Sequence, residues 1–280
     1  MWMLYVFLYV VFAIGYNQFY KVVLKTTKGD GSLTVLIQFI GGLTALLFSI
    51  FFEYKFPTDW KIYLLLGIAC IFYALSDRIN TVVRSGIEAS TFSIIKQLST
   101  VFMIVAGLLF FKEEFVLKKI IGAVLIIFSN ILIFYKKGNQ KLDKYVLLGI
   151  FSSIISSVAL FLDVNNSNNF NFAFYASLTL LVPALVITCA ERIKISKIKS
   201  KINKDNWKVV LTTGVCCGLT LISQLRAYQL GEATSVAPLC ALTVIGNVLV
   251  GYIFLKERSS LLKKLVAAGL IILSVFLIKG

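Results

Sequence analysis

Long apolar runs separated by short polar connections divide the whole chain of 280 residues. A bilayer core about 30 Å thick is crossed by roughly 20 apolar residues in a helix. Lipid offers no partner for backbone N–H and C=O groups, so each such run must be helical. Ten runs are long enough, at about residues 4–23, 32–52, 61–79, 88–111, 117–135, 144–162, 172–190, 207–227, 233–255 and 261–279. The sequence therefore predicts an all-α integral membrane protein with ten transmembrane helices.

Composition excludes several classes of function. Hydrophobic residues make up 59% of the chain and charged residues 15%, which is typical of a multi-pass membrane protein. There is no histidine, and the five cysteines fall in apolar segments without zinc-site spacing, so we expect no metal and no cofactor. The net charge of +15 comes from cations in short loops, which argues against nucleic-acid binding. We expect a protein of a bacterial plasma membrane.

An internal repeat relates the two halves at an offset of 144 residues, as between Glu88 and Glu232. After a one-residue insertion, the stretch LKKIIGAVLIIFSNILI from Leu117 aligns with LKKLVAAGLIILSVFLI from Leu262. The domains predicted are a five-helix repeat at residues 1–135, a linker at 136–143 and a second five-helix repeat at 144–280. Five is odd, so the second repeat is inverted, as in secondary transporters that bind substrate between the repeats.

Lysine and arginine are distributed unevenly between the two sides of the membrane. Most of the 28 lie in or beside loops 1, 3, 5, 7 and 9, and loop 6, at residues 163–171, has none. Cytoplasmic loops carry the excess of cations. The count alone therefore predicts that both termini are external.

Lys96 lies within the fourth span, in TFSIIKQLSTVF, at a cost of about 3 kcal/mol on insertion scales. Helical spacing puts Ser93, Lys96 and Thr100 on one small and polar face. We interpret Lys96 as the group that binds an anionic substrate, with Ser93 and Thr100 lining the path. The alternative is a structural ion pair with a carboxylate of another span, but no acid lies in the central part of any predicted span.

The ninth span offers the matching face, with Cys240, Thr243 and Asn247, and Pro238 interrupts its helix early. Thr243 and Asn247 are candidates for the substrate path, and helix–helix hydrogen bonding is the alternative. Further candidates for substrate binding are polar residues near span ends: Asn17, Tyr73, Gln224 and Arg226. Such residues are often interfacial anchors instead. Arg226 ranks first among these four because a second cation could hold a charged group in a bidentate manner.

Three further features have structural interpretations. Glu88 and Glu232 stand at helix starts, where a carboxylate interacts well with the helix dipole. The pairs Lys112–Glu113 and Lys256–Glu257 follow the fourth and ninth spans, and we expect them to close helical hairpins. Gly214 and Gly218 permit a close helix contact and make a homodimer possible.

The repeated block and GYNQFY in the first span resemble the EamA-type transporters of the drug/metabolite transporter superfamily. The resemblance is clear over residues 90–133 and 233–278, and implies a ten-helix carrier that works by alternating access. TFSIIKQLSTVF is also similar to a segment of triose-phosphate translocators in which a lysine at the Lys96 position binds phosphate. Their second basic pair is absent, since Val250 and Gly251 follow Gly246–Asn247 here. The resemblance thus implies a carboxylate or singly charged anion, and cytoplasmic termini.

Three functions remain open from the sequence. The first is a secondary transporter of a small polar, anionic metabolite, such as an amino acid, an organic acid or a sugar derivative. The second is an exporter of amphipathic or cationic compounds, for which Lys96 would be a structural or coupling residue. The third, a membrane-embedded enzyme or scaffold, is disfavoured because no nucleophile–base pair or metal set is visible, and we expect no enzyme.

Overall fold

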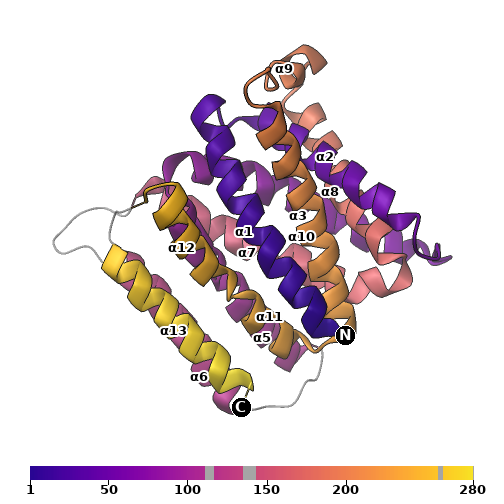
Figure 1. The fold of residues 1–280 in the computed structure, drawn as a ribbon. Helices are drawn as coiled ribbons and strands as arrows, with labels where there is room; N and C mark the ends of the chain where they lie inside the picture. Colours follow the sequence, from indigo (N-terminus) through magenta and orange to yellow (C-terminus); the bar gives the residue numbers. More distant parts are fainter. Residues whose placement is uncertain (111–116, 135–142, 258–260, 280) are drawn as a thin grey trace.

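A computed structural model describes residues 1–110, 117–134, 143–257 and 261–279. This part of the chain folds into helices and short connections and contains no strand (Figure 1). The helices are α1 (Trp2–Thr26), α2 (Gly31–Ser49), α3 (Trp60–Gly86), α4 (Ala89–Lys96), α5 (Leu98–Leu109), α6 (Leu117–Phe134), α7 (Lys144–Asn166), the 3₁₀ turn η1 (Ser167–Asn169), α8 (Phe172–Ala190), α9 (Ile195–Lys199), α10 (Trp207–Leu230), α11 (Ala233–Cys240), α12 (Thr243–Phe254) and α13 (Leu261–Lys279).

Polar residues at the run boundaries start four of the long helices. Asp30, Asp59, Asp143 and Asn171 occupy the N-cap positions of α2, α3, α7 and α8, and each side chain accepts a backbone N–H of the first turn. These N–H groups have no partner inside the helix, so the cap supplies it. The short polar connections thus define where each apolar run becomes helical.

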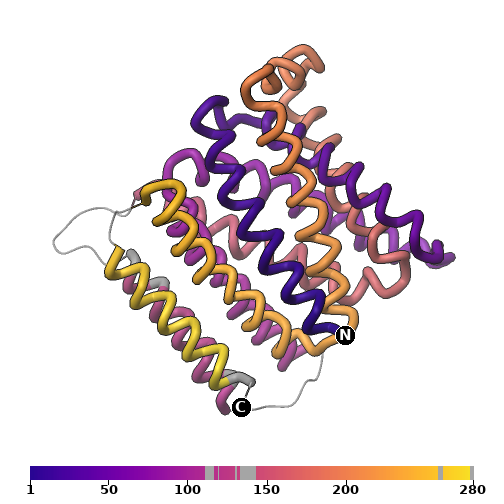
Figure 2. Tube along the Cα trace, viewed as in Figure 1, coloured from indigo at the N-terminus to yellow at the C-terminus, as the bar shows by residue number. Residues whose placement is uncertain are grey.

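The all-α membrane fold is confirmed. Among the described residues, eight segments are long and apolar enough to cross a membrane, and they coincide with eight of the predicted spans. The fourth and ninth spans are each built from two helices, α4 with α5 and α11 with α12. The other two predicted spans are occupied by α6 and α13, which lie side by side at one edge of the bundle (Figure 2). The count of ten crossings depends on this pair.

The helix contacts come in related pairs, as an inverted repeat requires. Replacing each helix of a contact by its counterpart in the other half gives the second contact of the pair. Helix α1 packs along α10, and its counterpart in the second half, α7, packs along α3. Helix α2 packs on α8, and α6 on α13. Helix α1 begins and α13 ends at the end of the bundle opposite α9, as an even number of crossings demands (Figure 1). The linker predicted at 136–143 lies almost wholly outside the described residues, so this boundary stays a prediction.

Both fourth helices of the repeat break at the same place. The backbone N–H of Gln97 bonds Ile94 O at 3.0 Å, one residue short of its regular partner, Ser93 O. In the second half, the backbone N–H of Ala241 bonds Pro238 O at 3.0 Å, again one residue short of its regular partner, Ala237 O. Pro238 weakens this helix just before the break, because its nitrogen has no hydrogen to donate to the carbonyl of Thr234. In the first half, the side-chain amide of Gln97 bonds Ser93 O at 3.2 Å in place of the backbone N–H.

Two predicted span boundaries were wrong. Helix α3 continues to Gly86 and α7 to Asn166, beyond the expected ends at 79 and 162. A span predicted from hydropathy stops where polar residues cluster. A helix that faces the protein interior can continue through such residues when their side chains are buried. Asp77, expected at a span end, consequently lies well inside α3, and Asp163, expected in loop 6, lies near the end of α7.

Helices α2 and α10 approach closely through glycine. A Cβ added to Gly41 would lie 3.0 Å from Gly214 O and 3.1 Å from Gly218 N. A Cβ on Gly218 would meet the Gly41 backbone even more closely. Gly214 and Gly218 are therefore used for packing within the chain, and their spacing is no evidence for a homodimer.

We predict that Gly218→Ala lowers the midpoint of thermal unfolding of the purified protein. Overpacking of this kind costs about 1–3 kcal/mol, because neither backbone can move without displacing its helix. Gly67→Ala in α3 is the matched control, since nothing lies within 4 Å of its added Cβ. Equal midpoints for the two variants would contradict the close contact.

Candidate functional site

A cavity of about 220 Å³ lies between the two halves of the bundle. Side chains from α1, α2, α3, α4, α5, α7, α8, α10, α11 and α12 line it. Both helix breaks lie beside the cavity. Ser93 and Ala237, whose carbonyls lose their regular backbone hydrogen bond at the breaks, are among the lining residues. Its position at the interface of the repeats is where transporters with inverted repeats bind their substrates.

Lys96 is the last residue of α4 and lines this cavity. Its ammonium donates a hydrogen bond to Ser156 Oγ of α7 at 2.6 Å. Within the described part of the chain it forms no salt bridge. A lysine ammonium has three donor hydrogens, so Lys96 has donors left for a group inside the cavity.

Asp77 of α3 also lines the cavity, and sequence reasoning placed it at a span end. It accepts a hydrogen bond from Gln38 Nε2 of α2 at 2.8 Å. Asp77 and Lys96 line the same cavity. The alternative that Lys96 is balanced by a carboxylate of another span therefore has a candidate partner, although the two side chains are not in salt-bridge contact.

Arg84 is a second buried cation of the cavity, and sequence reasoning missed it. Its side chain is 7% exposed. The guanidinium lies 4.7 Å from the ring centre of Tyr16, 4.9 Å from that of Tyr20 and 4.1 Å from that of Phe92. Such cation–π contacts contribute about 0.5–2 kcal/mol each. Because aromatic rings hold Arg84 and no carboxylate pairs with it among the described residues, its positive charge is available to the cavity.

A periodic signal for Arg84 was present in the sequence. Tyr73, Asp77, Thr81 and Arg84 recur at helical spacing along α3 and all line the cavity. The predicted span ended at residue 79, so Thr81 and Arg84 were not recognised as part of the same helix face as Tyr73 and Asp77. Extending the helix to Gly86 would have placed Asp77 and Arg84 on one inward-facing stripe.

The structure places seven of the nine predicted site residues around the cavity: Lys96, Ser93, Thr100, Thr243, Tyr73, Asn17 and Gln224. Their role in substrate binding stays a prediction. Asn247 and Arg226 are not among the lining residues. Arg226 instead lies 4.8 Å from the ring centre of Phe172 and bonds Gln229 Oε1 at 3.0 Å. The hypothesis that Arg226 holds the substrate beside Lys96 gains no support, and the second cation that lines the cavity is Arg84.

Asn247 joins three helices behind the cavity wall and is fully buried. Its Oδ1 accepts from Gln18 Nε2 of α1 at 3.0 Å, and its Nδ2 donates to Ser93 Oγ of α4 at 3.1 Å and to Thr243 O at 2.9 Å. These bonds orient Ser93, which does line the cavity. Asn247 thus matches the alternative interpretation, hydrogen bonding between helices.

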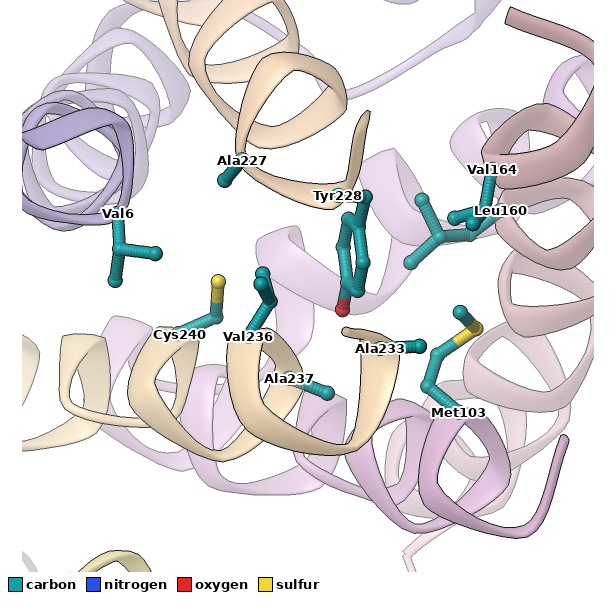
Figure 3. Packing of buried hydrophobic residues seen from close by; sticks show 10 residues of the cluster. All are labelled: Val6, Met103, Leu160, Val164, Ala227, Tyr228, Ala233, Val236, Ala237 and Cys240. Atoms are coloured by element: carbon teal, nitrogen blue, oxygen red, sulfur yellow. The ribbon is translucent and has the colours of Figure 1, made fainter. Parts of the chain in front are cut away.

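An apolar cluster forms the cavity wall toward the α1 N-terminus. Tyr228 lies in the middle of this cluster, as Figure 3 shows. Its buried members are Val6, Met103, Leu160, Val164, Ala227, Tyr228, Ala233, Val236, Ala237 and Cys240. Four of them, Leu160, Tyr228, Ala237 and Cys240, also line the cavity. The cavity is therefore bounded at this end by a packed apolar layer contributed by both halves.

The N-terminus of α4 is fixed by a residue of the other half. Helix α12 ends at Phe254, and two residues later the backbone of Lys256 is left-handed with φ 58°. Glu257 then accepts the N–H groups of Ala89, at 2.7 Å, and Ser90, at 3.1 Å. Glu88, expected to serve this helix start, makes no side-chain cap hydrogen bond and pairs with Lys264. The symmetry-related Lys112–Glu113 pair lies outside the described residues.

The site can bind and orient a small charged molecule. It presents two cations, one carboxylate, side-chain amides and hydroxyls within a mostly buried space. In the described part of the chain, no group of three metal-binding side chains is present.

Comparisons with known proteins agree with this architecture. The profile of the EamA-like transporter family matches residues 1–135 and 141–280. A curated relative from Sinorhizobium sp., described as "Uncharacterized transporter in cobO 3'region", is 33% identical over 81 residues, which are 28% of this chain and 57% of that protein. The match thus spans little more than half of the relative's length. A solved structure titled "Crystal structure of protein" has the same fold, with a TM-score of 0.69 at 14% identity, over 98% of this chain and 94% of that one.

We predict that Asn247→Leu lowers the thermal unfolding midpoint, because the amides of Gln18 and the hydroxyl of Ser93 lose their partner. An unsatisfied buried polar group costs about 1–3 kcal/mol. Asn17→Leu is the control: Asn17 lines the cavity and forms no hydrogen bond that the described structure shows. A midpoint for Asn247→Leu equal to that of Asn17→Leu would contradict the structural role.

Proposed function

Because the chain belongs to the EamA-like transporter family, we propose that it moves a small polar metabolite with a negatively charged group across a membrane by alternating access. Membrane transport itself follows from the family, and the chain is an integral multi-pass membrane protein. The bacterial relative is consistent with a bacterial plasma membrane. The substrate class and the transport mechanism are the parts that we propose. Amino acids, organic acids and sugar derivatives carry the required negative group.

The observation that carries the proposal is the pair of cations in one cavity. Lys96 is bonded to a neutral hydroxyl, and Arg84 is held by three aromatic rings. A cation in the middle of a membrane is costly, by about 3 kcal/mol on insertion scales. Two cations facing one carboxylate, Asp77, leave an excess positive charge in the cavity. An anionic substrate would neutralise that charge while it is bound.

Alternating access is supported by the pseudo-symmetry of the helix contacts. The main contacts between halves have counterparts with the halves exchanged, which favours a second arrangement of similar energy. The breaks at Gln97 and Ala241 divide the two central helices into segments that can tilt separately. Rocking of the halves would then open the cavity on one side at a time.

Export of cationic or amphipathic compounds is the second candidate function. Asp77 faces the cavity, and Tyr9, Tyr16 and Tyr73 add aromatic surface to it. A carboxylate with aromatic rings is a suitable environment for an organic cation. This function would require Asp77, in place of Lys96, to contact the substrate.

The two functions differ in the ligands that stabilise the folded protein. We predict that succinate, L-glutamate or L-alanine raises the thermal unfolding midpoint of the purified protein, whereas tetraphenylphosphonium does not. Each carboxylate compound is compared at the same concentration with its amide, which lacks the negative charge of the carboxylate. Stabilisation by tetraphenylphosphonium alone would favour the cation exporter.

We predict that Lys96→Met reduces transport of the stabilising carboxylate into proteoliposomes at least tenfold, a loss of about 1.4 kcal/mol. The substituent keeps most of the side-chain volume and removes the charge. Lys199→Met, at an exposed lysine of α9, is the matched control for charge removal. Transport by Lys96→Met at the level of this control, with both proteins folded, would contradict the binding role.

A further inference from the structure

Asp163 is a carboxylate that neither the cavity chemistry nor the fold has so far explained. It lies in α7, near the end of that helix, and is fully buried. Tyr73 of α3 donates a hydrogen bond to its Oδ2 at 2.7 Å, and Tyr175 of α8 donates to its Oδ1 at 2.7 Å. Two neutral hydroxyls from two other helices therefore hold one acid in a membrane-spanning segment.

The surroundings of Asp163 contain no cation that pairs with it in the described part of the chain. The titratable groups facing it are Tyr73 and Cys70 of α3 and Tyr175 of α8. Helix α5, which also packs on α7, has no titratable residue.

Two cations on neighbouring helices have other hydrogen-bond partners. Arg226 of α10 lies on the Phe172 ring and bonds Gln229. Lys96 of α4 bonds Ser156, which precedes Asp163 by two helical turns, or roughly 10 Å along α7. An ionised Asp163 would thus be a buried charge without a counter-ion.

Tyr73 connects this acid with the substrate cavity. It is a lining residue of the cavity, and its hydroxyl is bonded directly to Asp163. Tyr175 is not a lining residue; its hydroxyl receives a bond from Asn166 Nδ2 at 3.4 Å, and Asn166 also bonds Ile62 O at 3.0 Å. One carboxylate oxygen of Asp163 is therefore separated from the cavity by the hydroxyl of Tyr73 alone. The other oxygen is bonded to Tyr175, which does not line the cavity.

We propose that Asp163 is a reversible proton-binding site that couples the transporter to proton movement. An intramembrane acid without a counter-ion is costly when ionised, and such residues commonly belong to proton relays. As a carboxylate, Asp163 accepts from both tyrosines. After a proton arrives from water in the cavity, the acid donates to Tyr73 Oη, and the Tyr73 hydrogen turns toward the cavity. Both protonation states retain hydrogen bonds, and the proton returns to cavity water when it leaves.

This inference extends the proposed function, because it supplies the coupling that a secondary transporter needs. It does not depend on the substrate being an anion. Its test uses no substrate, so a failure here can be distinguished from a wrong substrate class.

The experiment is infrared difference spectroscopy of the full-length protein in nanodiscs during a pH titration. We expect a C=O stretching band of a protonated carboxyl group that disappears reversibly as the pH rises. Asp163→Asn should abolish this band, and Asp163→Glu should retain a shifted one. Asp77→Asn removes the acid of the cavity itself and should leave the Asp163 band in place.

The route is tested by hydrogen–deuterium exchange of the same carboxyl group. Tyr73→Phe removes the hydroxyl between Asp163 and the cavity, and should slow exchange of the band in heavy water at least tenfold. Tyr175→Phe removes one hydrogen bond of equal length without touching the cavity and should slow exchange less. A titration in which Asp163→Asn leaves every carboxyl band unchanged would overturn the proton site. Equal exchange rates in the two tyrosine variants would overturn the route through Tyr73.

Discussion

The burial of positive charge inside an apolar bundle is the constraint on which this structure depends. A membrane core stabilises neither a lysine ammonium nor a guanidinium, so each must find compensation within the protein. Arg84 is compensated by the rings of Tyr16, Tyr20 and Phe92, and Lys96 by the hydroxyl of Ser156. Neither arrangement neutralises the charge. The cavity therefore keeps a positive potential, partly balanced by Asp77, that a negatively charged substrate can use.

The two halves share a backbone plan but divide the chemistry between them. Both central helices break at equivalent positions, one through the side chain of Gln97 and the other after Pro238. At the position related to Lys96, the second half has Cys240, which is buried in the apolar cluster beside the cavity. Pseudo-symmetry thus relates the backbones of the two halves, while the asymmetry of the side chains gives the cavity one charged side and one apolar side.

Much of this architecture could be predicted from the sequence. Apolar runs indicated the helices and the repeat indicated two related halves, because length and hydropathy dominate folding in lipid. The face of Lys96, Ser93 and Thr100 does line the cavity. Hydropathy was a poor guide where a helix continues through polar residues that face the protein interior. Asp77, Arg84 and Asp163 were therefore placed outside spans or at their ends. Glu257 was also beyond reach, because its contact with the start of α4 joins residues 168 positions apart. Asn247 and Arg226 have side chains of the kinds that bind substrates, and only the structure shows that they do not line the cavity.

The central claim is that Lys96 contacts the negative group of the substrate. The most direct measurement compares the affinity of a stabilising carboxylate with that of its amide, in the wild-type protein and in Lys96→Met, by isothermal titration calorimetry. If Lys96 contacts the carboxylate, the substitution weakens carboxylate binding at least tenfold, about 1.4 kcal/mol, and leaves amide binding nearly unchanged. Equal losses for the two ligands, or no loss for either, would contradict the account.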